Sequence, residues 1–186
     1  MLMITVGTGV GGGLVLDGEL YRGAFGAAGE IGHLRVVRGG RLCGCGNHGC
    51  LEQYASGSAL VRDTRAEAHT PPAADLLARA GGDVLAIDGP MITRAAAEGD
   101  AFALARLKEL GTWLGEAIAS LAAVLDPGAV VIGGGVSESG DLLLEPVREA
   151  FVHELTGRGH RPFLDVRAAS LANRAGMIGA ADLARR

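Results

Sequence analysis

The chain has 186 residues, of which 48% are apolar and 20% are charged, the balance of an ordinary globular domain with one core. Its formal net charge of −4 argues against a duplex-binding surface, so no nucleic-acid partner is expected. No apolar run is long enough to span a membrane, and the first residues lack the positive flank of a signal peptide. We therefore expect a cytoplasmic protein without a membrane partner.

Three short strands are predicted at the start of the chain. Residues 2–6 form an apolar run that predicts a buried strand, and the glycine-rich stretch Gly7–Gly13 follows it. The dipeptide Asp17-Gly18 is a hairpin signal, which predicts a strand over 14–16 and a return strand over 19–22. The chain is therefore expected to open with three antiparallel strands.

The middle of the chain mixes weak and strong patterns. Residues 23–57 are rich in glycine and cysteine and weakly periodic, which predicts a loop region organised by something other than an apolar core. A helix is predicted over 58–69, and the proline-containing stretch 71–90 is expected to be a variable surface insertion. Apolar residues at helical spacing predict a long amphipathic helix over 101–125, which Asp126-Pro127-Gly128 ends.

The remaining third of the chain alternates strands and helices. A buried strand is predicted over 129–132, a helix over 142–155 and a strand over 163–169. Asn173 is the predicted N-cap of a final helix that reaches about Ala184. The order β-β-β-α-β-α-β-α predicts an α/β fold with a mixed sheet.

The sharpest signal is a group of metal-ligand residues in the loop region. His33, Cys43, Cys45 and Cys50 follow the pattern H-x9-C-x-C-x4-C, with glycines between the cysteines. Four nitrogen and sulfur ligands suit tetrahedral Zn²⁺, and full protein ligation implies a structural metal rather than a hydrolytic one. The competing interpretations are three small buried thiols near an unrelated histidine, and a redox site, which no C-x-x-C pattern supports.

Two carboxylates lie near this group in the sequence. Glu30 precedes His33 by three residues, and Glu52 follows Cys50 by two. Ionised carboxylates held in a rigid loop suit vicinal sugar hydroxyls, because such carboxylates only accept hydrogen bonds. Two solvated surface acids, or a general acid–base pair of the glycosidase kind, remain open on the spacing alone.

Two glycine-rich turns are candidate ligand sites. The backbone N–H groups of Gly7–Gly13 could cradle phosphate, with a tight hairpin as the alternative. No Gly-Lys-Ser/Thr follows, so this is not a P-loop, and the strand-like residues after the Gly7-x-Gly9-x-x-Gly12 match argue against a dinucleotide fingerprint. Gly133-Gly134-Gly135 follows a buried strand and precedes a helix, where α/β sheets place ligands, although a flexible turn explains it equally well.

Together these motifs resemble the glucokinase-like sugar kinases of the ROK family, in the actin/hexokinase-like, ribonuclease H-like superfamily. The resemblance covers nearly the whole chain and rests on the motifs Glu30-x-Gly32-His33, Cys43-x-Cys45-Gly46-x-x-Gly49-Cys50-x-Glu52-x-Tyr54-Ala55-Ser56-Gly57, Thr8-Gly9-Val10-Gly11-Gly12-Gly13 and Gly133-Gly134-Gly135-Val136-Ser137. It implies that residues 1–186 form the second, C-terminal lobe of such a kinase, with a zinc- and sugar-binding loop at 30–57.

The resemblance also implies roles for individual residues. Glu30, His33 and Glu52 would contact sugar hydroxyls, and His33 would serve as a zinc ligand as well. The residues implied in ATP binding lie in the two glycine turns: Thr8, Gly9, Gly11, Gly12, Gly133, Gly134 and Gly135. The implied reaction transfers the γ-phosphoryl group of Mg-ATP to the 6-hydroxyl of glucose or a related hexose.

One departure from the family pattern limits this expectation. The first phosphate loop of the family, Asp-x-Gly-x-Thr, and the Asn-Asp pair that contains the catalytic base are not found in this sequence. Phosphoryl transfer needs positioning from both sides of the cleft. We therefore expect the N-terminal lobe and the catalytic aspartate to be missing, and this chain alone to be inactive.

Two alternatives belong to other functional classes. The parent protein could be a sugar-sensing ROK transcriptional regulator that has lost its helix-turn-helix, or the chain could be a non-catalytic sugar-binding module. In each case a homo-oligomer is expected, because helix 173–184 is apolar around much of its circumference.

Overall fold

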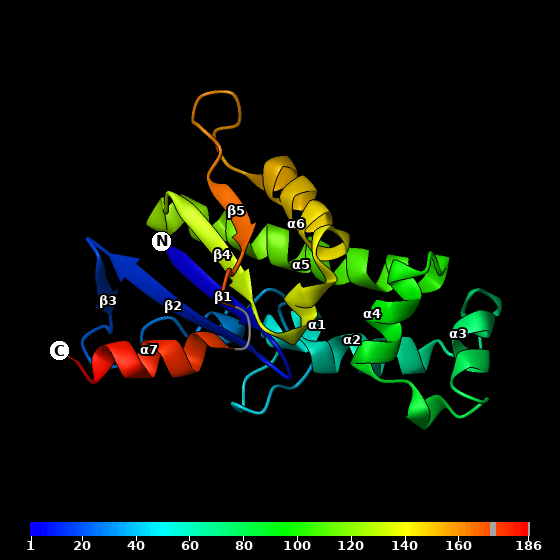
Figure 1. The fold of residues 1–186 in the computed structure, drawn as a ribbon. Coiled ribbons are helices and arrows are strands. Elements are labelled where there is room, and N and C mark those ends of the chain that lie inside the picture. The colour runs from blue at the N-terminus through cyan, green and yellow to red at the C-terminus, as the bar shows by residue number, and fades with distance from the viewer. Residues whose placement is uncertain (172–173, 186) are drawn as a thin grey trace.

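The computed structural model describes residues 1–171 and 174–185, and a five-stranded sheet lies at the centre of this part of the chain (Figure 1). The predicted N-cap Asn173 lies outside the described residues. The strand order is β3-β2-β1-β4-β5. The strands are β1 (Leu2–Val6), β2 (Val10–Leu16), β3 (Glu19–Tyr21), β4 (Ala129–Gly133) and β5 (Asp165–Ala168).

The sheet is mixed, as predicted. β1 and β2 pair antiparallel, as do β2 and β3, whereas β1 pairs parallel with β4 and β4 pairs parallel with β5. One strand boundary differs from the prediction, because β2 begins at Val10 and Gly11–Gly13 belong to the ladder opposite Met3–Thr5. A run of glycines shows no alternation of apolar side chains, so only the partner strand reveals that it is extended.

Helices follow the three opening strands and then alternate with the parallel strands. The α-helices are α1 (Glu52–Ala55), α2 (Gly57–Ala66), α3 (Ala74–Arg79), α4 (Gly89–Ala97), α5 (Ala101–Leu125), α6 (Asp141–Glu154) and α7 (Ala175–Leu183). The short 3₁₀ helices are η1 (Ile31–His33), η2 (Pro71–Ala73), η3 (Val84–Ala86) and η4 (Gly135–Ser139).

The core lies between the sheet and the long helix α5, which passes behind the strands in Figure 1. Leu2, Ile4 and Val6 of β1 are fully buried, and α5 buries apolar side chains at helical spacing. This helix has the predicted boundaries because Asp100 caps its first turn, accepting from Ala103 N at 2.9 Å, and Asp126 ends it in the left-handed conformation. The helix α5 therefore covers one face of the sheet.

The stretch 71–90, predicted as a surface insertion, is partly core. Leu76 and Ile87 are fully buried, and α3, η3 and the start of α4 cover this part of the chain. The prolines were interpreted as helix breakers, and this was wrong. Pro71 and Pro90 occupy the first turn of η2 and α4, where the missing N–H has no helical partner to lose.

The final helix α7 buries no side chain in this structure. Met177 is 70% exposed and Ile178 is 41% exposed, so the apolar surface predicted for this helix faces solvent. Among the described residues, every helix is too short or too polar to cross a membrane.

Candidate functional site

The predicted metal ligands form a compact cluster beside the sheet. The ligand atoms of His33, Cys43, Cys45 and Cys50 all lie within 4.8 Å of one another. His33 ends η1, and the cysteines lie in a loop that bends back through a hydrogen bond from Cys43 N to Asn47 O of 2.8 Å. Local backbone geometry thus brings together ligands that span 18 positions.

The separations within the cluster fit a tetrahedral zinc ion. Bonds of about 2.3 Å to sulfur and about 2.0 Å to nitrogen place two sulfurs roughly 3.8 Å apart, and a sulfur and a nitrogen roughly 3.5 Å apart. The sulfurs of Cys45 and Cys50 are 3.7 Å apart, and Cys43 Sγ is 3.6 Å from His33 Nδ1. The residues therefore fit a closed metal site in which Nδ1 of His33 is the ligand.

The three thiols differ in acidity. Burial raises the pKa of Cys43 to about 12 and also raises the pKa of Cys50, whereas the backbone N–H of Asn47 lowers the pKa of the exposed Cys45. Without a metal, Cys43 keeps its proton and donates it to Glu52 Oε1 at 3.0 Å. A bound metal ion would hold this sulfur as a thiolate instead.

The two predicted carboxylates have different surroundings. Glu52 opens α1, and its Oε1 lies 3.9 Å from His33 Nδ1, so the structure brings this carboxylate to the metal cluster. Glu30 precedes η1 and accepts a hydrogen bond from His33 N at 3.1 Å through its backbone carbonyl. Its side chain is exposed to solvent. Both acids flank His33, one through its side chain and one through its backbone.

Close packing of glycines holds η1 against β2. A Cβ on Gly32 would lie 2.0 Å from Val10 O, and a Cβ on Gly12 would lie 2.7 Å from Gly29 O. Side chains at these positions would push η1, and His33 with it, away from the sheet. Gly12, which pairs with Ile4 in β2, therefore serves the packing of the loop that carries the candidate metal ligands.

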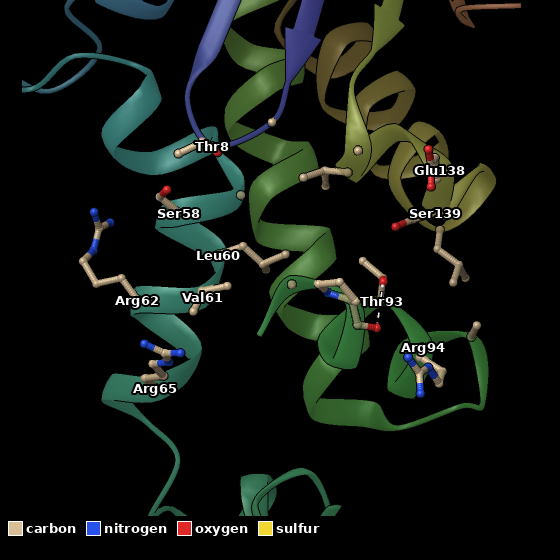
Figure 2. A pocket seen from close by; sticks show the side chains of 18 residues that line it. Thr8, Ser58, Leu60, Val61, Arg62, Arg65, Thr93, Arg94, Glu138 and Ser139 are labelled. Carbon is tan, nitrogen blue, oxygen red and sulfur yellow. Dashed lines mark hydrogen bonds between the residues drawn. The ribbon is translucent and has the colours of Figure 1, made fainter. Parts of the chain in front are cut away.

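A cavity of about 1170 Å³ opens on the other side of the β1–β2 turn, between α2, α4 and η4 (Figure 2). This is large enough for a nucleotide-sized ligand. Figure 2 shows Thr8 and Ser58 near one end and Thr93 and Arg94 on the opposing wall. Leu60 of α2 adds an apolar surface.

Only part of the predicted ATP-binding set lines this cavity. Thr8 and Gly135 do, whereas the lining leaves out the other five predicted glycines: Gly9, Gly11, Gly12, Gly133 and Gly134. Gly134 instead packs against the end of β1, where a Cβ would lie 2.4 Å from Val6 O, and it adopts a φ of +92°. It thus sets the course of the loop that carries Gly135.

The walls of the cavity were not predicted from the sequence. Arg62 and Arg65 of α2 and Thr93 and Arg94 of α4 line it, although no motif singled them out. The available signal was the capping residue Asp88, which accepts from Met91 N at 2.8 Å and marks the start of α4.

The turn between β1 and β2 separates the cavity from the metal cluster. Gly7 and Thr8 line the cavity, while a Cβ on Gly9 would lie 2.8 Å from Glu52 Oε2. The N-terminus of α2 is attached to the same turn, because Gly57 N donates to Gly7 O at 2.7 Å. A ligand in the cavity would therefore lie across three residues of backbone from the carboxylate of Glu52.

Comparison with known proteins adds a family assignment. Residues 1–186 match the ROK family. The glucokinase of Streptomyces coelicolor is 48% identical to this chain over 187 aligned residues, which cover all of this chain and 59% of that protein. A putative xylose repressor of Caldicellulosiruptor is 36% identical over 148 residues, which cover 80% of this chain and 37% of that protein.

A solved structure gives the same picture. The crystal structure of a ROK family glucokinase from Streptomyces griseus, in complex with glucose and AMPPNP, superimposes with a TM-score of 0.94 at 50% identity. The match covers 99% of this chain and 60% of that one. The chain thus spans about three fifths of the length of these two relatives.

Proposed function

Because this chain belongs to the ROK family, we propose that it supplies the hexose-binding and nucleotide-binding surfaces of an ATP-dependent glucokinase. Residues 1–186 correspond, in this proposal, to the second lobe of the enzyme, with the metal-binding loop at 30–57. Glucose is the favoured hexose because the relatives with the highest identity and coverage are named glucokinases.

The observation that carries the proposal is the position of the β1–β2 turn between two dissimilar sites. Gly7 and Thr8 face the nucleotide-sized cavity, and Gly9 adjoins Glu52 at the metal cluster. Phosphoryl transfer requires the phosphate donor and the acceptor hydroxyl to lie next to each other. A nucleotide in the cavity with its phosphates at Thr8 would meet a hexose held at Glu52.

The hexose would be held by Glu30, His33 and Glu52. With Nδ1 of His33 directed at the sulfur of Cys43, Nε2 of the same ring is left for a sugar hydroxyl. The carboxylate of Glu52 would accept hydrogen bonds from hydroxyl groups. Zinc bound by His33 and the three cysteines would be structural, because four protein ligands leave no open position.

The reaction would join the hexose 6-hydroxyl oxygen to the γ-phosphorus of Mg-ATP and break the bond from that phosphorus to the β–γ bridging oxygen, which releases ADP. Backbone N–H groups of the Thr8 turn would stabilise the phosphate charge. The hydroxyl proton would pass to a base that we do not assign to any residue of this sequence. The chain would therefore contribute binding and orientation.

Direct binding tests the proposal. Isothermal titration of the zinc-loaded chain with glucose, and separately with Mg-AMPPNP, should give saturable binding at one site each. Glu52→Gln should weaken glucose binding and leave nucleotide binding intact. If the wild-type chain bound neither glucose nor Mg-AMPPNP at millimolar concentration, the assignment would be refuted.

A second candidate function is sugar sensing without phosphorylation. Similarity to a putative xylose repressor over 80% of the chain favours it, and the same sugar-binding residues would serve. Glucose binding without any nucleotide binding would select this alternative.

The proposal also includes assembly into a homo-oligomer and a cytoplasmic location. The three cysteines are free thiols, and free thiols persist in the reducing cytoplasm.

A further inference from the structure

Arg41 connects the metal-binding loop to helix α2. It lies two residues before the ligand Cys43, and its guanidinium donates from Nη1 to Asp63 Oδ2 at 2.7 Å. The same nitrogen reaches Gln53 O at 3.3 Å, and the backbone N–H of Arg41 donates to the hydroxyl of Tyr54 at 2.9 Å. One loop residue thus contacts both α1 and α2.

Arg62 of α2 donates hydrogen bonds to the same two acceptors. Its Nε and Nη2 donate to the two oxygens of Asp63, each at 3.0 Å, and Nη2 also donates to Gln53 O at 2.6 Å. Arg62 is one of the residues that line the nucleotide-sized cavity. Asp63 and the carbonyl of Gln53 therefore join an arginine of the metal-binding loop to an arginine of the cavity wall.

The positions of these acceptors matter for both sites. Gln53 directly follows Glu52, the carboxylate beside the metal cluster. Asp63 lies in the middle of α2, whose first residue is bonded to the β1–β2 turn at Gly7. A shift of the metal-binding loop that pulls on Arg41 would consequently move α1 and α2 together.

The charge of Asp63 suits this role. Partial burial by itself would raise its pKa, but hydrogen bonds from Arg62 and Arg41 hold the pKa of Asp63 below its ordinary value. The carboxylate is therefore ionised at neutral pH and accepts three charge-assisted hydrogen bonds. Its side chain is only 26% exposed, less than either arginine.

We propose that Asp63 is a positioning residue that couples the metal- and hexose-binding loop to the nucleotide cavity through Arg41 and Arg62. This proposal rests on the proposed function for the identity of the two ligands, but the coupling itself is a property of the chain. Order in the loop fixes Arg41, which fixes α2 through Asp63. By thermodynamic linkage, a nucleotide that orders α2 favours the ordered loop to the same extent.

The first experiment uses zinc alone as the probe. Hydrogen exchange of the amides of α2 is measured for the zinc-loaded protein and after chelation. Loss of zinc should speed exchange in α2 of the wild type, and it should have no further effect on α2 in Asp63→Asn or Arg41→Gln. Glu145→Gln, which removes a similar carboxylate from Arg148 on α6, is the matched control and should behave as the wild type. The proposal would be overturned if the exchange rate of the α2 amides in the wild type were the same with and without zinc.

The second experiment measures the coupling factor between ligands. Saturating glucose should tighten Mg-AMPPNP binding by about fivefold or more in the wild type, and this factor should fall towards one in Asp63→Asn with zinc content unchanged. Asp63→Glu should restore part of it. If Asp63 had only a structural role, Asp63→Asn would lower the affinities for glucose and for Mg-AMPPNP but leave the factor by which glucose tightens Mg-AMPPNP binding unchanged. That result would also overturn the proposal. If the wild type binds neither ligand, the proposed function fails, while zinc-dependent exchange still decides the coupling.

Discussion

Substitution of Gly32 by alanine should separate η1 from the sheet. The new Cβ would lie 2.0 Å from Val10 O, about 1 Å closer than the 3.0 Å below which real Cβ atoms are essentially never found. The new Cβ is fixed to the backbone of residue 32 and Val10 O is itself a backbone atom, so no side-chain rotation can relieve the clash. Overpacking of this kind costs about 1–3 kcal/mol. The restricted unfolded chain of alanine offsets about 0.4–1 kcal/mol of this cost, so the net loss is centred on about 1.3 kcal/mol and reaches about 2.6 kcal/mol at most.

The assay is thermal unfolding combined with zinc analysis. For a chain of 186 residues, the central loss of about 1.3 kcal/mol should lower Tm by roughly 3–5 °C. Zinc content should fall as well, because His33 follows Gly32 and metal–ligand distances tolerate only about 0.2 Å. Gly44→Ala is the control, since a Cβ there meets no atom within 4 Å. A Gly32→Ala protein with the Tm and zinc content of the wild type would refute the packing argument.

The other predictions concern the metal, the hexose and acid stability. Elemental analysis should find one zinc per wild-type chain and a clear loss in Cys45→Ser; equal zinc in both proteins would argue against the site. Glu52→Gln should weaken glucose binding about ten- to a hundredfold with zinc retained, and unchanged affinity would make Glu52 a solvated acid. Gly9→Ala should displace the Glu52 carboxylate and weaken glucose binding while Tm stays within about 2 °C, because a flexible side chain can give way; a large drop in Tm would mean that the turn itself is strained. Because the pKa of Asp63 is lowered in the folded protein, its stabilisation is present above the unfolded value near 3.9 and is lost as pH falls through the folded value. Urea titrations should therefore show Asp63→Asn about 1 kcal/mol less stable than the wild type at pH 7. This difference should shrink as the pH falls below about 3.9, and a difference that stayed constant with pH would contradict the assignment.

The sequence predicted elements well where their ends carry local signals. Helix α5 has the predicted boundaries because Asp100 and Asp126 act at its two ends, independently of tertiary contacts. Strand β2 was predicted too short, because Gly11–Gly13 have no side chains whose alternation could indicate an extended chain. Helix α4 was missed because Pro90 was interpreted as a loop residue rather than as part of the first helical turn.

The metal cluster and the cavity also differ in how far local sequence signals predict them. The cluster was predictable because His33 and the three cysteines lie close in sequence and have a recognisable ligand chemistry. The cavity walls come from α2, α4 and η4, which are distant in sequence and carry ordinary helical patterns. Only the packed chain reveals that Arg62 and Arg94 are among the residues that line one cavity.

The parallel pairing of β1 with β4 determines when the sheet can be completed during translation. Leu2 lies opposite Val130, so the central strand acquires its second neighbour only after 128 more residues have been made. At roughly 5–20 residues per second on the ribosome, β1 waits roughly 6–26 s with one edge unpaired. During this time the hairpin of β1 and β2 exposes apolar side chains that α5 will later cover. Slow codons before residue 129 should therefore increase the dependence of the nascent chain on chaperones, whereas slow codons after β4 should have little effect.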